Sequence, residues 1–123
     1  MCIRDSPHCV IYWEDLDSLD IAKIGSAVEN CELFPERVNV EFIRILDNNT
    51  VKMRVWERGS GETWACGTGA CAAAVAAVLG GHCQKDREIL VKLKGGDLEV
   101  RYTDETVYMT GKAQMVFEGT VEI

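Results

Sequence analysis

Apolar and polar residues alternate along several segments of the chain, as they do in β-strands that bury one face and expose the other. The clearest segment runs from Val51 to Trp56, where three apolar residues alternate with Lys52 and Arg54. The turn-forming run Asp47-Asn48-Asn49 precedes it and predicts a hairpin with the strand before. The predicted strands are His8 to Trp13, Val38 to Ile45, Val51 to Trp56, Ile89 to Lys94, Asp97 to Tyr102, Thr106 to Thr110 and Met115 to Ile123.

Two segments predict helices of different kinds. Apolar residues from Leu19 to Asn30 recur at helical spacing, which predicts an amphipathic helix that ends before Pro35. Residues Ala70 to Leu79 are all Ala, Cys, Val or Leu, so a helix there is apolar on every side and should be buried all round. The run Cys66-Gly67-Thr68-Gly69 leads into this helix, Gly80-Gly81 closes it, and we expect a flexible loop at Gly59-Ser60-Gly61 before it.

These elements together predict an α+β domain over residues 7–111. A strongly curled mixed or antiparallel sheet wrapped around a central Ala-rich helix would explain both the one-sided strands and the fully apolar helix. The first six residues, Met1 to Ser6, fit no pattern that follows and resemble a translated sequencing adapter. We therefore expect residues 1–6 to be a non-native leader.

Composition and charge narrow the classes of function. The chain has 123 residues, 47% of them hydrophobic, which is an ordinary globular balance. Its 20 acidic and 13 basic residues give a net charge of −7, which argues against binding nucleic acid or an anionic membrane surface. No apolar signal-peptide segment follows Met1, so we expect a cytoplasmic protein.

The six cysteines allow two readings. In a secreted chain they would indicate a disulfide scaffold, but without an export signal we expect reduced thiols. The neighbouring pairs His8-Cys9 and His82-Cys83 lack the spacing of zinc ligands, and we expect no metal site.

One cysteine, Cys66, lies at a position that favours a reactive thiol. Cys66 lies at the predicted start of the apolar helix, where free backbone N–H groups carry partial positive charge. Such a position binds carboxylates and lowers the pKa of a thiol, while Gly67 and Gly69 would let a ligand approach closely. Cys66 is therefore a candidate nucleophile or base.

Two simpler interpretations compete with a reactive Cys66. Free cysteines commonly pack as small apolar residues, and position alone does not exclude that. The spacing Gly67-x-Gly69-x-x-Ala72 also matches a dinucleotide-binding loop. That loop should directly follow a strand in a parallel β-α-β unit. Here the preceding strand ends near Trp56, and the later strands are predicted to form hairpins. We therefore expect no dinucleotide binding.

Three blocks of sequence carry a resemblance to a known family. They are Pro7-His8-Cys9-Val10, the run from Leu33 to Phe42, and the run from Trp56 to Ala72 around Ala65-Cys66-Gly67-Thr68-Gly69. In order and spacing they resemble the C-terminal part of diaminopimelate epimerases. The resemblance covers Pro7 to Ile123 and corresponds to less than half of a full-length member.

The resemblance implies an amino-acid isomerase that works without a cofactor. The family converts LL-diaminopimelate to the meso isomer without pyridoxal phosphate or metal, using two cysteines on opposite faces of the substrate. One thiolate removes the α-proton and the other thiol returns a proton, while helix N-termini hold the substrate carboxylate. The implied partner is thus a small molecule, diaminopimelate, and homodimer formation by the full-length protein stays open.

Residue by residue, the resemblance assigns roles to seven positions. Cys66 matches the second catalytic cysteine, His8 a histidine near the thiols, and Glu57 an acidic residue near the thiol and the distal ammonium. The matched substrate-binding positions are Asn39 and Arg58 at the distal end, again Glu57, and Gly67 and Thr68 through their backbone amides.

The chain departs from the family pattern at its beginning. The family has Gly-Asn where Asp5-Ser6 stands, and its first catalytic cysteine belongs to a preceding half that this sequence does not contain. By the same pattern, residues 112–123 would form a strand that returns to that half, and the domain lacks its first strands. We therefore expect the isolated chain to lack epimerase activity, because two-base inversion needs both thiols.

Two alternative functions stay open: that of a related isomerase similar to proline racemase, and that of a binding domain without catalysis.

Overall fold

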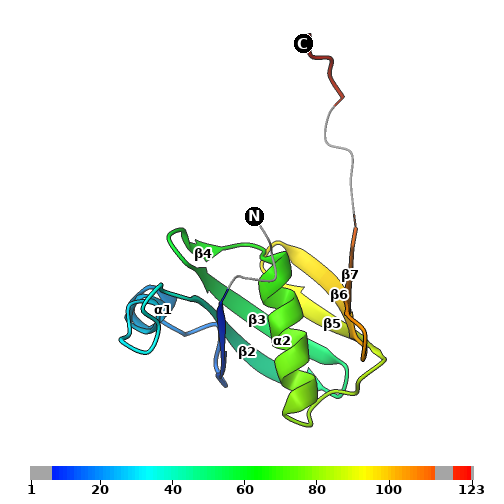
Figure 1. The fold of residues 1–123 in the computed structure, drawn as a ribbon, viewed down its shortest axis with the longest axis horizontal. Helices are drawn as coiled ribbons and strands as arrows, with labels where there is room; N and C mark the ends of the chain where they lie inside the picture. The colour runs from blue at the N-terminus through cyan, green and yellow to red at the C-terminus, as the bar shows by residue number, and fades with distance from the viewer. Residues whose placement is uncertain (1–6, 113–117, 123) are drawn as a thin grey trace.

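A mixed β-sheet carries the fold, with one helix against each of its faces (Figure 1). The computed structural model describes residues 7–112 and 118–122, and within them the sheet has seven strands. The helices are α1 (Ile21–Glu29) and α2 (Gly67–Leu79). The strands are β1 (His8–Tyr12), β2 (Asn39–Asp47), β3 (Thr50–Glu57), β4 (Gly61–Thr63), β5 (Glu88–Leu93), β6 (Gly96–Tyr102) and β7 (Val107–Gly111).

The strand order is β1-β2-β3-β5-β6-β7, with β4 paired to β3 beside this path. β2 and β3 form the predicted hairpin, and the Asp47 carboxylate accepts a hydrogen bond from the Asn49 backbone N–H at 2.9 Å. The β1–β2 and β3–β5 pairs are parallel, and the remaining pairs are antiparallel. The sheet is therefore mixed, as predicted.

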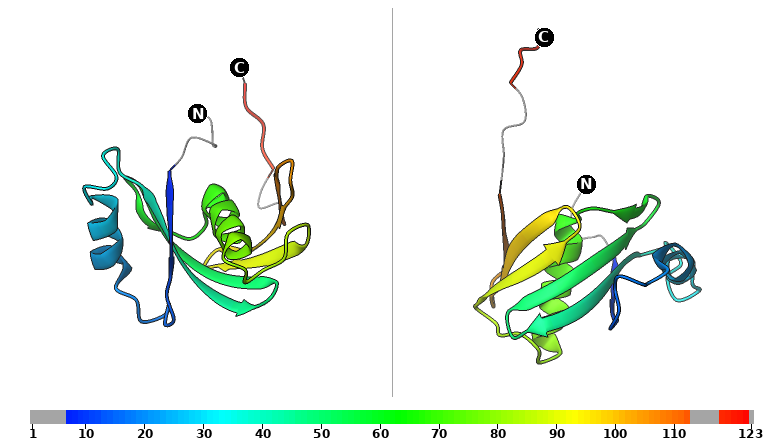
Figure 2. Two further views of the ribbon diagram at one scale, coloured as in Figure 1. Left: turned by 60° about the horizontal axis from the view of Figure 1, so that its bottom comes forward. Right: turned by 180° about the vertical axis from the view of Figure 1, so that it is seen from behind.

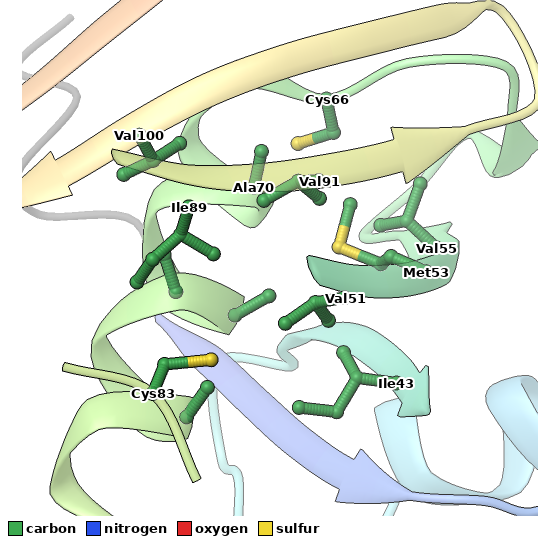
Figure 3. Packing of buried hydrophobic residues seen from close by; sticks show 13 residues of the cluster. Ile43, Val51, Met53, Val55, Cys66, Ala70, Cys83, Ile89, Val91 and Val100 are labelled. Carbon is green, nitrogen blue, oxygen red and sulfur yellow. The ribbon is translucent and has the colours of Figure 1, made fainter. Parts of the chain in front are cut away.

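Helix α2 packs against one face of the sheet through its smallest residues. Ala70, Ala73, Ala74 and Ala77 are fully buried, because their short side chains let the helix lie close to the strands. They join an apolar cluster with residues of β2, β3, β5 and β6. Figure 3 shows Cys66 at one end of this cluster and Cys83 at the other.

Helix α1 covers the opposite face of β1 and β2. Its N-cap is Asp20, whose carboxylate accepts a hydrogen bond from the Lys23 backbone N–H at 3.3 Å. A second apolar cluster forms there around Leu16, Val40 and Phe42. Figure 2 shows the two helices on different sides of β1 and β2, which explains why four successive residues of β2, 40–43, are all buried.

The structure corrects three expectations about the elements. Helix α2 begins at Gly67 rather than Ala70, so the glycine lead-in belongs to its first turn. Of the expected loop Gly59-Ser60-Gly61, the first two residues lie in a turn, but Gly61 is the first residue of strand β4. Of the strand predicted over 115–123, residues 115–117 and 123 lie outside the described residues, as does the leader 1–6, and residues 118–122 contain no strand.

The expectation of a strongly curled sheet is also wrong. In the described part of the chain the sheet is open, with β1 and β7 at its two ends. The sheet covers only one side of α2, and no described strand joins β1 to β7 across the other side. The expectation that this helix is buried all round is therefore wrong: Ala72, Val75 and Ala76 are half-buried and Leu79 is exposed. Within residues 7–112 and 118–122, no helix is long and apolar enough to span a membrane.

Candidate active site at the start of helix α2

The predicted site residues on strands share one face of the sheet. Side chains alternate along a strand, and the apolar neighbours Val10, Ile43 and Val55 belong to the cluster beneath α2. Positions two or four residues away along the same strands therefore face α2 as well. These positions are His8 on β1, Asn39 and Glu41 on β2, and Glu57 on β3.

Cys66 is the N-cap residue of α2. Its backbone is extended, with φ −146° and ψ 105°, and its Sγ accepts a hydrogen bond from the Gly69 backbone N–H at 3.3 Å. The Thr68 hydroxyl lies 3.5 Å from the same sulfur. The thiol thus takes the place that Ser, Thr or Asp usually occupies at a helix start, and the residue is only 9% exposed.

Burial determines the protonation state of this thiol. Burial, the main cause, and the neighbouring Glu57 carboxylate together raise the pKa of Cys66 to about 11. The hydrogen bonds from Thr68 and Gly69 act in the opposite direction but are weaker. In this structure the effect of the helix N-terminus on the thiol is therefore outweighed by burial, and the pKa of Cys66 lies above its usual value rather than below it.

His8 is held by a carboxylate that the sequence analysis did not single out. The Nδ1 atom of His8 lies 2.7 Å from Oε1 of Glu41, and Glu41 is fully buried. Burial raises the pKa of Glu41, and the hydrogen bond with His8 partly offsets that rise. A signal for this residue existed in the sequence: Glu41 occupies a position that strand alternation assigns to the buried face.

The side chain of Asn39 accepts a hydrogen bond from the backbone of Arg58. The Arg58 N–H donates to Oδ1 of Asn39 at 2.7 Å, and the Arg58 guanidinium donates to the Glu36 carbonyl at 3.2 Å. Asn39 therefore positions the start of the Arg58 turn with its carbonyl oxygen. Its side-chain NH₂ group remains available as a donor to a ligand.

Glu29 of α1 fixes the same turn from the other side. Its Oε2 accepts a hydrogen bond from the Gly59 N–H at 3.0 Å, and its Oε1 accepts one from Nε1 of Trp56 at 2.9 Å. Arg37 pairs with the same carboxylate at 3.3 Å. The hydrogen bond from Trp56 is the main cause that lowers the pKa of Glu29. Sequence reasoning missed this residue, because no local pattern links α1 to the turn after β3.

A groove of about 800 Å³ runs along the uncovered side of α2. Its lining combines His8, Gly67 and Thr68 with apolar residues of β1, α2 and β7 and with Glu105 and Thr106 just before β7. Cys66, Asn39, Glu57 and Arg58 do not line this groove. The structure thus brings His8 and the first turn of α2 together in the groove, while Asn39 and Arg58 meet in a separate turn.

The cysteines in the described residues, Cys9, Cys31, Cys66, Cys71 and Cys83, are free. Within the same residues, no three His, Cys, Asp or Glu side chains are grouped so that they could hold a metal ion.

The fold and the site define an α+β domain that presents a buried cysteine at the N-terminus of a helix packed against the sheet. Residues 5–116 match the family model of diaminopimelate epimerase, and the chain belongs to that family.

Curated relatives agree with this assignment. The chain is 51% identical over 118 residues to a diaminopimelate epimerase of Bacillus cytotoxicus, covering 95% of the chain and 41% of that protein. It is 52% identical over 120 residues to a diaminopimelate epimerase of Methanococcus maripaludis, covering 96% of the chain and 43% of that protein. The chain therefore spans about two fifths of the length of the curated relatives it matches.

Proposed function

We propose that this chain is a segment of a diaminopimelate epimerase and that Cys66 supplies one of its two catalytic thiols. The observation that carries the proposal is the place of Cys66, as the N-cap of a helix that packs against the sheet on one side and opens into a groove at its first turn. An α-proton of an amino acid is weakly acidic, so its removal needs strong stabilisation of the developing negative charge. Backbone N–H groups at a helix start supply that stabilisation best where water is excluded.

The protonated state of Cys66 fits one direction of the reaction. A thiolate elsewhere in the whole protein would remove the α-proton of the LL isomer from one face. The thiol of Cys66 has a pKa of about 11 and so carries a proton at neutral pH. Cys66 would deliver its own proton to the opposite face of the carbanion. In the reverse direction the two sulfurs exchange roles. No cofactor enters this scheme, because both proton transfers use protein thiols.

The remaining predicted residues would bind the substrate. The backbone amides of Gly67 and Thr68 would hold the reacting carboxylate at the start of α2. Arg58 would pair with the distal carboxylate through its planar guanidinium, beside the free NH₂ group of Asn39. Glu57 would attract the distal ammonium group. His8 would act beside the thiols.

We also propose that the whole protein is located in the cytoplasm.

Replacement of Cys66 in the full-length protein tests the proposal. Cys66→Ala should lower the rate of LL-to-meso conversion by about 10²–10⁴-fold, because a proton donor at the reacting carbon is lost. Cys31→Ala, which changes a thiol away from α2, should leave the rate unchanged. An unchanged rate in Cys66→Ala would favour the alternative of a domain that binds without catalysing.

A further inference from the structure

Glu41 is a buried carboxylate for which the proposed reaction provides no role. It lies on β2 with its side chain fully buried, and Oε2 has no hydrogen-bond partner among residues 7–112 and 118–122. A carboxylate that is removed from water loses several kcal/mol of solvation, of the order of that for other buried charges, unless partners replace the water. The groups around Glu41 should therefore explain why a carboxylate is present at this buried position.

Groups from three elements surround the Glu41 carboxylate. His8 on β1 lies 2.7 Å from Oε1, which is the short range of charge-assisted N–H···O⁻ hydrogen bonds. The first turn of α2 approaches so closely that a Cβ on Gly69 would lie 2.9 Å from Oε1 and 3.2 Å from the Cys66 sulfur. Glu57 on β3 is the other charged neighbour, and its negative charge opposes ionisation of Glu41.

The start of α2 favours the ionised form of this carboxylate. The partial positive charge of the helix N-terminus attracts an anion, and the absence of a side chain at Gly69 lets the carboxylate reach it. An ionised carboxylate accepts hydrogen bonds and donates none. Burial and Glu57 act in the opposite direction and raise the pKa of Glu41. When Glu41 is ionised, the atom of His8 that faces it carries the proton.

We propose that Glu41 is a positioning residue that fixes the tautomer and direction of His8. Its Oε1 accepts a hydrogen bond from the Nδ1–H of His8, so that Nε2 carries a lone pair and faces the groove beside Gly67 and Thr68. His8 thereby presents a hydrogen-bond acceptor to an N–H, S–H or ammonium donor at the helix start. Only the catalytic consequence of this inference depends on the proposed function.

Nuclear magnetic resonance of the histidine rings in the 123-residue chain tests the inference without an activity assay. The sequence contains two histidines, so exposed His82 serves as an internal reference for an unconstrained ring. Near neutral pH, His8 should show a pyrrole-like ¹⁵N shift with a directly bonded proton at Nδ1 and a pyridine-like shift at Nε2. A proton on Nε2 of His8, or the same mixture of tautomers as in His82, would overturn the proposal.

Two substitutions separate the hydrogen bond from the bulk of the side chain. Glu41→Gln keeps an acceptor oxygen for Nδ1–H and should keep the His8 tautomer, whereas Glu41→Leu of similar size should give a mixture. A His8 tautomer that persists in Glu41→Leu would contradict the positioning role. The wild-type spectrum decides the tautomer even where a variant fails to fold.

Kinetics of the full-length protein separate this inference from the proposed function. Glu41→Leu should lower kcat by tenfold or more with little change in KM, and Glu41→Gln should restore much of the loss. Unchanged kcat in Glu41→Leu, together with a strong loss in Cys66→Ala, would refute the positioning role alone. Retained activity in Cys66→Ala would refute the proposed function and leave the spectroscopic result standing.

Discussion

At the scale of single residues, Cys66 is subject to two opposing influences. The N–H of Gly69 and the hydroxyl of Thr68 stabilise a negative sulfur, as a helix start does in general. Burial beneath the strands, together with the nearby Glu57 carboxylate, penalises that charge more strongly. The balance leaves a proton on Cys66 at neutral pH, which is the state a proton donor requires.

This raised pKa makes stability depend on pH. The folded thiol keeps its proton up to a pKa of about 11, while the unfolded thiol loses it near 9.0. The contribution of this thiol to the free energy of unfolding is fully present below about pH 9. It is lost as the pH rises toward about 11, because in this range the unfolded state releases the proton and the folded state keeps it. The two-unit difference corresponds to at most about 3 kcal/mol.

Urea unfolding of the wild-type chain and of Cys66→Ser at a series of pH values measures this effect. Serine keeps an N-cap acceptor but does not titrate in this range. The free energy of unfolding should fall more steeply between pH 9 and 11 in the wild type than in the variant. Parallel curves would show that Cys66 titrates normally.

The sequence predicted where Cys66 lies but not its protonation state. The glycine-rich lead-in and the apolar helix are local patterns, and they predict a cysteine at a helix start. The burial of that cysteine depends on β3, β5 and β6, which reach it from distant parts of the chain. Glu41 was missed for a similar reason, because its partner His8 lies 33 residues away.

At the scale of elements, α1 and β3 meet without room for an added atom. A Cβ on Gly25 of α1 would lie 2.7 Å from Cγ and 2.8 Å from Cβ of Trp56. These atoms are near the backbone of β3 and cannot swing aside as the end of a flexible side chain can. Glycine is therefore required at this position for packing rather than for its backbone angles.

Gly25→Ala should destabilise the chain by about 1–3 kcal/mol, the usual effect of overpacking a well-filled contact. This loss should exceed the gain of up to about 1 kcal/mol from better helix propensity. Lys23→Ala on the exposed side of α1 is the control and should shift stability by about 0.5 kcal/mol or less. A Gly25→Ala variant as stable as wild type would show that α1 lies farther from β3.

Helix α1 also supports the turn that carries Arg58. Glu29 accepts hydrogen bonds from Gly59 and Trp56 and pairs with Arg37. Glu29→Leu leaves these donors without their acceptor and should destabilise the chain by about 1–3 kcal/mol. Thermal unfolding measures the loss, and Glu32→Leu on the exposed surface after α1 is the matched control.

The order of the elements followed from the sequence more fully than their pairing did. Alternation and helical spacing predicted the hairpin of β2 and β3, and also both helices, because these are local signals. The parallel pairing of Thr50–Lys52 in β3 with Leu90–Lys92 in β5 has no local signal. Strand β4 has only three residues, too few for a visible alternation, and was not predicted as a strand.

At the scale of the whole molecule, only part of the site, His8 and the first turn of α2, opens onto the uncovered side of this helix. The sheet lies on one side of this helix, and the groove with His8, Gly67 and Thr68 lies on the other. The relatives at about 50% identity are more than twice as long as this chain. In the described part of the chain, α2 is the one helix whose N-terminus carries a cysteine. We therefore propose that inversion requires a second thiol from outside these residues.

Hydrogen exchange at the α-carbon tests this central claim most directly. The purified 123-residue chain, shown to be folded by its amide spectrum, is incubated with LL-diaminopimelate in D₂O, and deuterium at the α-carbons is measured by mass spectrometry. We predict no deuterium-labelled meso isomer above the amount formed by the Cys66→Ala chain, because one thiol cannot remove the proton from one face and return a proton to the opposite face. Deuterium incorporation with formation of the meso isomer, at a rate near that of a full-length epimerase, would contradict the account.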